Sequence, residues 1–424
     1  MATPTAHIIA GGTHFHVRPH LALAAPAYGA TGRALLHELE TRGRAAALHL
    51  TTMAGGPKDL DTNADVARLV DALVADPATR LVFMPVALCD FTASVLEGGA
   101  PTPSGKGAPR LRTAAGAQTL ALTPAPKVIG AVRRERKDIF LVGFKTTAGA
   151  TPAEQLAAGL RLLKQSSCNL VLANDLHTRL NMVVTPEQAS YHVTEDRRAA
   201  IAGLVEMALL RSELTFTRST VVPGEPVPWS SELVPEALRR VVDHCIARGA
   251  YKPFLGATVG HFAVKLGDGR FLTSRRKTDF NRLAEVGLVL VEARGESEVV
   301  AHGSRPSVGG QSQRIVFAEH PGLDCIVHFH CPLRAGSPVL VRSQRPFECG
   351  SHECGKNTSD GLRRFGDAWA VMLDRHGPNV VFSRDADPER VIRFIEESFD
   401  LAGTTAGFPL SDGAGGEQGR AALR

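Results

Sequence analysis

The first half of the chain alternates short, continuously apolar runs with segments of helical periodicity. Strands that are apolar on both faces are typical of a parallel sheet covered by helices on both sides. We therefore expect an N-terminal α/β domain with a doubly wound, Rossmann-like parallel sheet, whose ligands bind outside the carboxyl ends of the strands. The apolar runs lie at residues 6–10, 46–51, 80–86, 138–144 and 169–175.

Polar or glycine residues follow several of these predicted strands. Backbone amides in a glycine turn or at a helix N-terminus favour anions. These positions therefore predict a site for an anionic ligand, although tight turning alone would also explain the glycines. The candidate binding residues are Gly11, Gly12, Asp90, Lys145 and Asn174.

An apolar run that ends in two histidines marks the second half. Residues i and i+2 of a strand face the same side, so His328 and His330 are placed to hold one ion together. His376 ends another apolar run and precedes a glycine, which makes it the natural third ligand. Three protein ligands with an open position are typical of catalytic zinc, and imidazole also suits Fe, Mn, Co and Ni. A half-buried strand edge is the alternative explanation.

Residues 239–402 carry landmarks that resemble the class II aldolase/adducin family, in the family's order. The resemblance implies an α/β/α domain with an antiparallel sheet and a divalent metal, zinc first, on His328, His330 and His376. It also implies substrate contacts from His261, Thr273, Ser274 and Ser307. The landmarks are Gly260-His261, Thr273-Ser274, Pro306-Ser307, the two strand histidines, Gly350-Ser351-His352-Glu353 and His376-Gly377.

Two positions depart from this family's pattern. Gly309 stands where the family has its acid/base carboxylate, and His261 replaces the asparagine of the phosphate-binding turn. The acid/base group must then come from elsewhere, with Glu353 and His352 as first candidates and Glu348 as another. Arg275, Arg276 and Lys277 are a possible phosphate or carboxylate site, or simply a solvated hairpin end. Cys349, His352 and Cys354 would make a second metal or redox site, but two buried small side chains fit the cysteines better.

The first half resembles phosphopantothenoylcysteine synthetase, a nucleotide-dependent ligase family. The resemblance implies binding of CTP or another nucleotide. Three positions depart from it: residues 23–27 lack the family's asparagine, Arg110 replaces a lysine, and Thr147 replaces an acid. We therefore predict that the domain binds a nucleotide without forming an acyl-nucleotide. The matching segments are residues 9–13, 17–18, 28–32, 85–91, 126–129, 142–145 and 173–175.

These patterns predict a nucleotide-binding domain at 1–213, a linker at 214–232, a metal domain at 233–403 and a disordered tail at 404–424. The net charge of +5 is dispersed, so no nucleic-acid partner is expected. No apolar run is long enough for a membrane, and seven irregularly spaced cysteines favour reduced thiols in the cytoplasm. Both families build active sites near subunit contacts, which predicts a homo-oligomer.

The sequence thus predicts a metal-dependent lyase of aldolase type. It would cleave carbon–carbon bonds, epimerise or decarboxylate a phosphorylated or nucleotide-linked small molecule through a metal-stabilised enediolate. One alternative is a CTP- or ATP-dependent ligase of phosphopantothenate and cysteine. Another is a non-catalytic binding or scaffold protein of adducin type, against which the three histidines argue.

Overall fold

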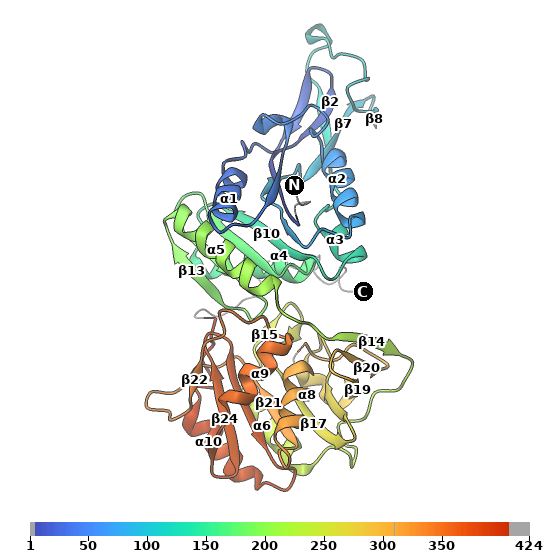
Figure 1. Ribbon diagram of the computed structural model, residues 1–424. Helices are drawn as coiled ribbons and strands as arrows, with labels where there is room; N and C mark the ends of the chain where they lie inside the picture. Colours follow the sequence, from blue (N-terminus) through green and yellow to red (C-terminus); the bar gives the residue numbers. More distant parts are fainter. Residues whose placement is uncertain (1–4, 309, 407–424) are drawn as a thin grey trace. The chain divides into compact units, whose positions relative to one another are not determined.

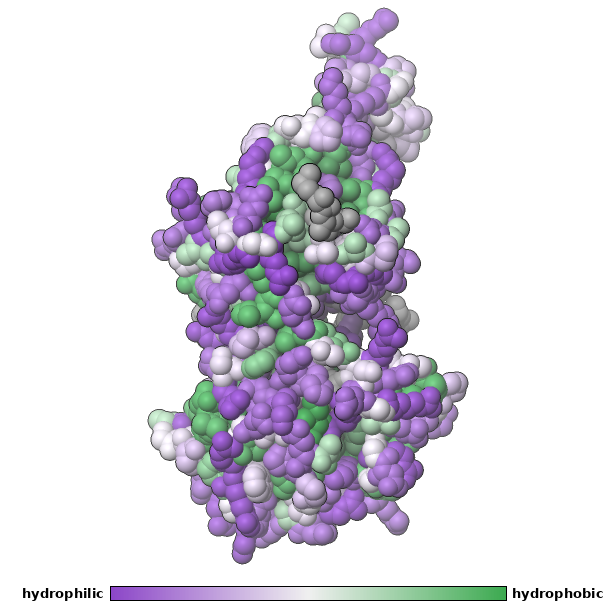
Figure 2. All heavy atoms as spheres, viewed as in Figure 1, coloured by the Kyte–Doolittle hydropathy of each residue, from purple (hydrophilic) through white to green (hydrophobic). Residues whose placement is uncertain are grey.

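A computed structural model describes residues 5–308 and 310–406, and these form two compact units (Figure 1). The first unit comprises residues up to Gly149, Leu162–Val183 and His192–Ala208. The second comprises Ala150–Arg161, Val184–Tyr191 and the residues from Leu209 onward. Hydrophilic residues cover most of the surface seen in Figure 2, with smaller hydrophobic areas interspersed. Within the described ranges, no helix has the length and apolar character needed to cross a bilayer.

The first unit is built on a twisted sheet with a parallel core, as the apolar runs predicted. Strand β1 pairs in parallel with β4 and β5, and β10 pairs in parallel with β5 and β11. Consecutive parallel strands direct their carboxyl ends to one edge of the sheet. In spatial order the strands are β13 (Ser190–Thr194), β12 (Asn181–Val184), β11 (Leu170–Asp175), β10 (Phe140–Thr147), β5 (Leu81–Phe83), β1 (Ala6–Gly12) and β4 (Ala46–Leu50), and β6 (Val86–Ala87) pairs with the end of β1.

Helices and two small sheets complete this unit (Figure 1). Helix α2 shows the local logic: Thr62 and Asp65 form a capping box at its start, and Val66, Val70 and Leu73 bury its apolar face. The helices are α1 (Ala30–Thr41), α2 (Asn63–Ala75), α3 (Gly130–Glu135), the last five residues of α4 (Pro152–Ser166) and all but the last four residues of α5 (Arg197–Ser212). The small sheets are β2 (His14–Arg18) with β3 (Leu21–Ala24), and β7 (Phe91–Glu97) with β8 (Ala100–Pro101) and β9 (Thr119–Pro124).

The second unit contains a ten-stranded, mainly antiparallel sheet, as the resemblance implied. Its central strands β17, β18, β19, β21, β24 and β25 pair only antiparallel with one another. In order the strands are β14 (Arg218–Val222), β20 (Glu298–His302), β19 (Leu288–Arg294), β18 (Arg270–Ser274), β17 (His261–Gly267), β21 (Cys325–His328), β25 (Gly377–Phe382), β24 (Ala368–Leu373) and β22 (Val341–Arg342), and β23 (Arg363–Phe365) pairs with β24.

Helices cover both faces of this sheet. Phe262 and Val264 of β17 join one apolar cluster with α6 (Glu236–Ala247) and α10 (Pro388–Ser398). Ala263, between them, joins a second cluster with α8 (Gly310–Glu319) and α9 (His352–Gly361). Alternate residues of the strand thus serve opposite faces, which explains why its sequence is apolar throughout. The described fold is a mixed α/β architecture in both units.

Two expected boundaries differ from the structure. Residues 214–232, expected as a linker, include β14, which pairs in parallel with β20 in the second unit's sheet. Val227 bridges Leu288, and Trp229 is buried in the core cluster. The prolines that suggested a linker only separate these short pairings. Of the expected tail, Thr404–Ala406 are described and pack against the sheet, while residues 407–424 lie outside the described part.

Gly377 sets the sharpest steric requirement in the second unit. Its φ is +140°, and a Cβ there would lie 2.1 Å from the carbonyl oxygen of Phe329. We predict that Gly377→Ala lowers the free energy of unfolding by more than about 2 kcal/mol, because strain and a backbone clash add. Thermal and denaturant unfolding would measure the loss.

The matched control is Gly267→Ala in the β17–β18 turn of the same unit. Gly267 has φ +102° but no atom within 4 Å of a Cβ built there, so it reports strain without a clash. Equal losses from both substitutions would contradict the close-approach argument.

Candidate metal centre

Three buried histidines meet at one end of the second unit's sheet. Strand β21 ends at His328, and His330 follows two residues later. Strand β25 pairs antiparallel with β21, with His328 opposite Asn379, and the turn before β25 carries His376. The ligand atoms of the three side chains lie within 4.8 Å of one another. The ring centroids of His376 lie 4.5 Å from His328 and 5.0 Å from His330.

The backbone around these rings is held tightly. Gly377 allows the turn to reach the carbonyl oxygen of Phe329, which lies between the two strand histidines. Thr405 then ties both sides, because its N–H donates to His330 O at 3.1 Å and its hydroxyl donates to His376 O at 3.1 Å. Ligands fixed by their surroundings are the arrangement that metal sites require.

The hydrogen bonds leave ring nitrogens available for an ion. A carbonyl oxygen can only accept, so His328 Nδ1 carries the proton and donates to Pro378 O at 2.8 Å. The Nε2 of His328 then presents a lone pair. Within residues 5–308 and 310–406, neither this Nε2 nor His376 Nδ1 has a hydrogen-bond partner. Buried unpaired nitrogens of this kind cost about 1–3 kcal/mol each, so the donor set fits a bound divalent cation.

The electrostatics favour the neutral, metal-binding form of the rings. Burial lowers the pKa of His328 to about 4, although its hydrogen bond to Pro378 works in the opposite direction. Burial, followed by the neighbouring His328 and His330, lowers the pKa of His376 well below its ordinary value. Near neutral pH these imidazoles are therefore unprotonated, as coordination requires.

His261 packs against His328, one of the three histidines. It pairs with His328 across β17 and β21, and the two rings stack with centroids 4.7 Å apart. Its Nδ1 accepts from the amide of Gln313 at 2.9 Å. His261 was predicted as a substrate contact, and only 4% of it is exposed. Gln313 was not predicted, because nothing in its sequence position signals a contact with a residue 52 positions away.

The predicted substrate residues converge on the same edge of the sheet. Ala263 pairs with Thr273, so Ser274 ends β18 beside the start of β17. Ser307 N donates to Ser274 O at 3.0 Å, which brings these two predicted residues together. Among described atoms, the buried Ser274 hydroxyl has no partner. The Thr273 hydroxyl instead donates to Phe262 O, which gives it a structural role.

A group of cations follows β18 at this edge. Arg276 N donates to Arg305 O, and burial, then the Arg305 charge, lowers the pKa of the Arg276 guanidinium. The pKa of the Lys277 ammonium is lowered as well, first by burial and then by the charges of Arg276 and Arg305. Arg275 does not join them, because its guanidinium donates to Val286 O. Arg276, Lys277 and Arg305 are therefore the cations placed to hold an anion.

The predicted acid/base residues lie at the start of α9. Both carboxylate oxygens of Glu353 lie 3.1 Å from Thr215 N, and His352 N donates to Thr215 O. Neither side chain is among the three ligands. Glu348 is buried. Burial of Arg211 acts to lower the pKa of its guanidinium, but nearby negative charges, including that of Glu348, raise this pKa overall. The family position Gly309 lies outside the described residues.

A fully buried ion pair was missed by the sequence reasoning. Arg211 Nη1 lies 3.1 Å from Glu187 Oε2, and both side chains are completely inaccessible. The other oxygen of Glu187 accepts from Cys349 N at 2.6 Å. Arg211 also contributes to the lowered pKa of His376, after burial and the neighbouring histidines. A single buried charge pair leaves no periodic pattern in a sequence, so only the fold reveals it.

In the first unit, the predicted nucleotide residues lie at the carboxyl ends of parallel strands. Gly11 and Gly12 end β1, where a Cβ would lie 2.0 Å from Thr51 Oγ1 and 2.1 Å from Ala25 O, respectively. Close packing therefore explains both glycines without a ligand. Their shared strand end still opens toward the edge where such sheets bind ligands.

Of the remaining predicted residues, Lys145 and Asn174 lie near the ends of β10 and β11, and Asp90 lies just before β7. Lys145 pairs with Ala173 and Thr146 with Asn174, so β10 and β11 end side by side. Asp90 is exposed and bonds to Lys127 at 2.5 Å. At the position where the resemblance expects an acid, the Thr147 hydroxyl donates to Asp175 at 2.8 Å.

Comparisons with known proteins match these two halves separately. Residues 244–335 match the family model "Class II Aldolase and Adducin N-terminal domain". The first half is 26% identical over 175 residues to the Coenzyme A biosynthesis bifunctional protein CoaBC of Thermococcus kodakarensis. That match covers 40% of this chain and 40% of the relative, so the chain spans about two fifths of the relative's length.

Two solved structures also show limited similarity to part of the chain. The DNA/pantothenate metabolism flavoprotein from Streptococcus pneumoniae shares 19% identity at a TM-score of 0.41, over 48% of this chain and 97% of that one. YgbL, a putative aldolase/epimerase/decarboxylase from Escherichia coli, shares 18% at a TM-score of 0.28, over 38% and 83%. The chain thus joins a phosphopantothenoylcysteine synthetase-like part to a class II aldolase-like part.

The buried histidines predict a pH-dependent stability of the metal-free protein. Above pH 6.5 His328 is neutral in both states, but between 6.5 and about 4 only the unfolded chain takes up the proton. The free energy of unfolding should therefore fall as the pH falls through this window, by roughly 1.4 kcal/mol per pH unit for each such histidine.

Denaturant titrations of chelator-treated protein at pH 7.5, 6 and 4.5 would measure this slope. His328→Gln should make it shallower, whereas His244→Ala on the surface of α6 should not. A flat dependence of the wild type over the window would contradict the buried neutral histidines.

Proposed function

We propose that the chain is a metal-dependent lyase of aldolase type. The observation that carries the proposal is the convergence of three buried histidines, of which His328 and His376 have ring nitrogens without a partner in the described structure. His328 and His330 lie within residues 244–335, which match the aldolase family model, and His376 follows that range. A bound zinc-class ion would supply a Lewis acid that polarises a substrate carbonyl. The chemistry would be carbon–carbon cleavage, epimerisation or decarboxylation.

The chain's own residues supply the rest of the reaction. His328, His330 and His376 hold the ion, and His261 with Gln313 fixes the ring of His328 from behind. Arg276, Lys277 and Arg305 bind the phosphate or carboxylate of the substrate, with the Ser274 hydroxyl as a further donor. The Glu353 carboxylate accepts a hydrogen bond from Thr215 N. In the reaction it releases this N–H, turns to the substrate and transfers the proton at the substrate carbon.

The first unit would bind a nucleotide or nucleotide-linked ligand at Gly11, Gly12, Asp90, Lys145 and Asn174. Support comes from their shared strand edge and from the match to the CoaBC relative. The exposed Arg110 and the engaged Thr147 hydroxyl favour binding without ligase chemistry. We further propose that the protein acts in the cytoplasm, that it forms a homo-oligomer, and that its substrate is a small phosphorylated molecule.

The metal prediction is tested by elemental analysis together with turnover. His328→Ala should lose one equivalent of divalent metal per chain, because two strand imidazoles and His376 form one ligand set. Turnover would be measured with a panel of sugar phosphates and nucleotide-linked sugars. The products to detect are an aldehyde or ketone fragment, an epimer of the substrate, or CO₂. His244→Ala, another partly buried histidine of the same unit, is the control and should keep its metal.

Glu353→Gln separates the ion from the proton transfer in the same assay. It should retain the metal while turnover falls by about 10²–10⁴-fold. Unchanged metal content in His328→Ala would refute the ligand set, and full turnover in Glu353→Gln would move the acid/base role to another residue.

The nucleotide prediction is tested by calorimetric titration of the full chain with CTP and ATP. Binding should weaken at least about tenfold in Lys145→Ala, which removes an exposed cation at the strand edge. Lys137→Ala, at an exposed lysine just before the start of β10, is the control. Pyrophosphate release with phosphopantothenate and cysteine would contradict the loss of ligase activity.

A further inference from the structure

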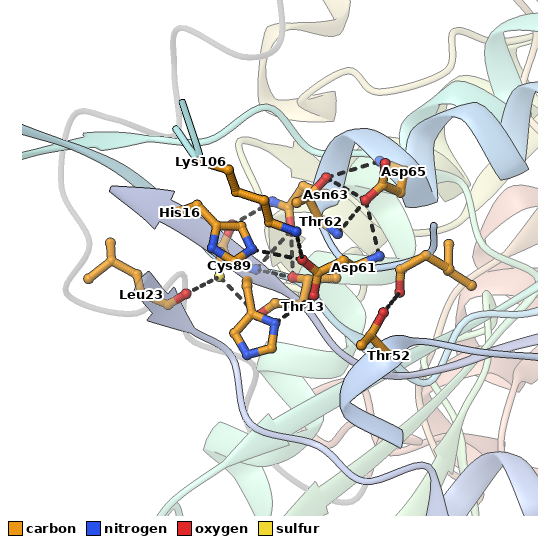
Figure 3. A network of polar contacts seen from close by, with 12 residues as sticks. Thr13, His16, Leu23, Thr52, Asp61, Thr62, Asn63, Asp65, Cys89 and Lys106 are labelled. Atoms are coloured by element: carbon orange, nitrogen blue, oxygen red, sulfur yellow. Dashed lines mark hydrogen bonds and ion pairs between the residues drawn. The ribbon is translucent and has the colours of Figure 1, made fainter. Parts of the chain in front are cut away.

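A second cluster of histidines lies in the first unit, centred on the carboxylate of Asp61 (Figure 3). His14 Nδ1 lies 2.8 Å from one carboxylate oxygen, and His16 Nε2 lies 2.7 Å from the other. The ammonium of Lys106 lies 2.9 Å from the oxygen that His16 contacts. Nothing in the proposed reaction uses these residues.

The sequence spacing and the backbone explain why the groups converge. His14 and His16 are residues i and i+2 of β2, so their side chains share one side of the strand. Asp61 lies alongside, because His14 N donates to Asp61 O at 2.9 Å and His14 forms a parallel bridge with Thr62. The backbone N–H of Asp61 donates to Asp65 at 3.0 Å. The carboxylate is thus fixed by main-chain pairing, independently of the histidines.

A surrounding network braces the same two segments. The Thr13 hydroxyl donates to Asn63 Oδ1 at 2.7 Å, and Asn63 Nδ2 donates to Cys89 O at 2.8 Å. Cys89 N closes the ring by donating to the Thr13 hydroxyl at 3.0 Å. These bonds lock the start of β2 against the start of α2, as Figure 3 shows. Outer residues that fix ligand orientation are typical of metal sites.

We propose that His14, His16 and Asp61 form a binding site for a divalent transition-metal ion. Their candidate ligand atoms all lie within 4.8 Å of one another. Two imidazoles and one carboxylate are a ligand set for zinc, iron and manganese that leaves positions open. The donors would separate by a few tenths of an ångström to admit an ion. The inference concerns the first unit alone and does not depend on the proposed lyase activity.

The central carboxylate decides between a cation and an anion as the ligand. Asp61 is 8% exposed, whereas His14 and His16 are 29% and 19% exposed. Burial alone would raise the pKa of Asp61, but the hydrogen bonds from His16, Lys106 and His14 together hold it well below its usual range. A carboxylate at the focus, contacted by two imidazoles and one ammonium, would repel phosphate, so the geometry favours a positively charged ligand.

Lys106 indicates how the ion would enter. Its ammonium is the cation paired with Asp61, and its side chain is 63% exposed, whereas the Asp61 side chain is 8% exposed. The ammonium can therefore move into solvent, and the ion that replaces it keeps the buried carboxylate paired, so the exchange leaves no unpaired buried charge. An arriving dication competes with this ammonium for one carboxylate oxygen. Removing Lys106 should consequently tighten metal binding, a direction that a purely structural network would not produce.

The test uses the full chain with His328→Ala and His330→Ala, so that the first ligand set is broken. Equilibrium dialysis and calorimetry with Zn²⁺, and the visible absorption of Co²⁺, should show one remaining equivalent per chain. Asp61→Asn and His16→Gln should each weaken it at least about tenfold, and Lys106→Ala should strengthen it. His37→Ala, an exposed histidine of α1, is the matched control and should change nothing.

Thermal unfolding of each variant distinguishes lost binding from lost structure. His16→Gln keeps a polar side chain at a partly buried position, 19% exposed, so it covers the case in which Asp61→Asn does not fold. Wild-type protein should then bind two equivalents, of which His14→Ala with His16→Ala removes one. Any one of three results would overturn the site: no bound metal in the protein with His328→Ala and His330→Ala, full metal binding by His16→Gln, or weaker metal binding by Lys106→Ala. The proposed lyase stands or falls separately, on the ion held by His328.

Discussion

The arrangement of the three buried histidines depends on the close approach of one turn to one strand end. The residue after His376 must come within van der Waals distance of the carbonyl between His328 and His330, and only glycine permits this at φ +140°. The antiparallel pairing of β21 with β25 sets the register, and Pro378 O selects the tautomer of His328. A local steric condition thus determines both the ligand geometry and the protonation of the ligands.

The same register organises the rest of the sheet edge. Because β17 pairs with both β18 and β21, His261, Ser274 and His328 end their strands in adjacent positions. The cations after β18 therefore follow directly from the topology that builds the metal centre. Apolar side chains on both faces hold these strands between helices, so the polar residues at the strand ends are supported by a rigid frame.

Much of this could be predicted from the sequence, since periodicity and strand spacing are local properties. The apolar runs predicted the parallel core of the first unit, and the spacing of His328 and His330 predicted side chains that converge. What the sequence could not supply were long-range pairings. Strand β14 was mistaken for part of a linker because the prolines that follow it were visible and its partner β20, about 80 residues away, was not.

The cluster around Asp61 also could not be predicted from local sequence patterns. His14 and His16 have the same spacing as His328 and His330, but they lie in a separate five-residue strand that follows the apolar run of β1 and do not end that run. Their carboxylate partner is 45 residues from His16, and the buried partner of Arg211 is likewise remote in sequence. Side-chain groups assembled from separate elements become recognisable only when the fold brings them together.

The central claim is that an ion is held by three imidazoles on the second unit's sheet. X-ray absorption spectroscopy of zinc-loaded full-length protein, in the His14→Ala, His16→Ala background, tests it most directly. The account predicts a first shell of nitrogen and oxygen at about 2.0–2.1 Å, with the multiple scattering that imidazole rings produce. A shell that contains sulfur, or one without imidazole scattering, would contradict it.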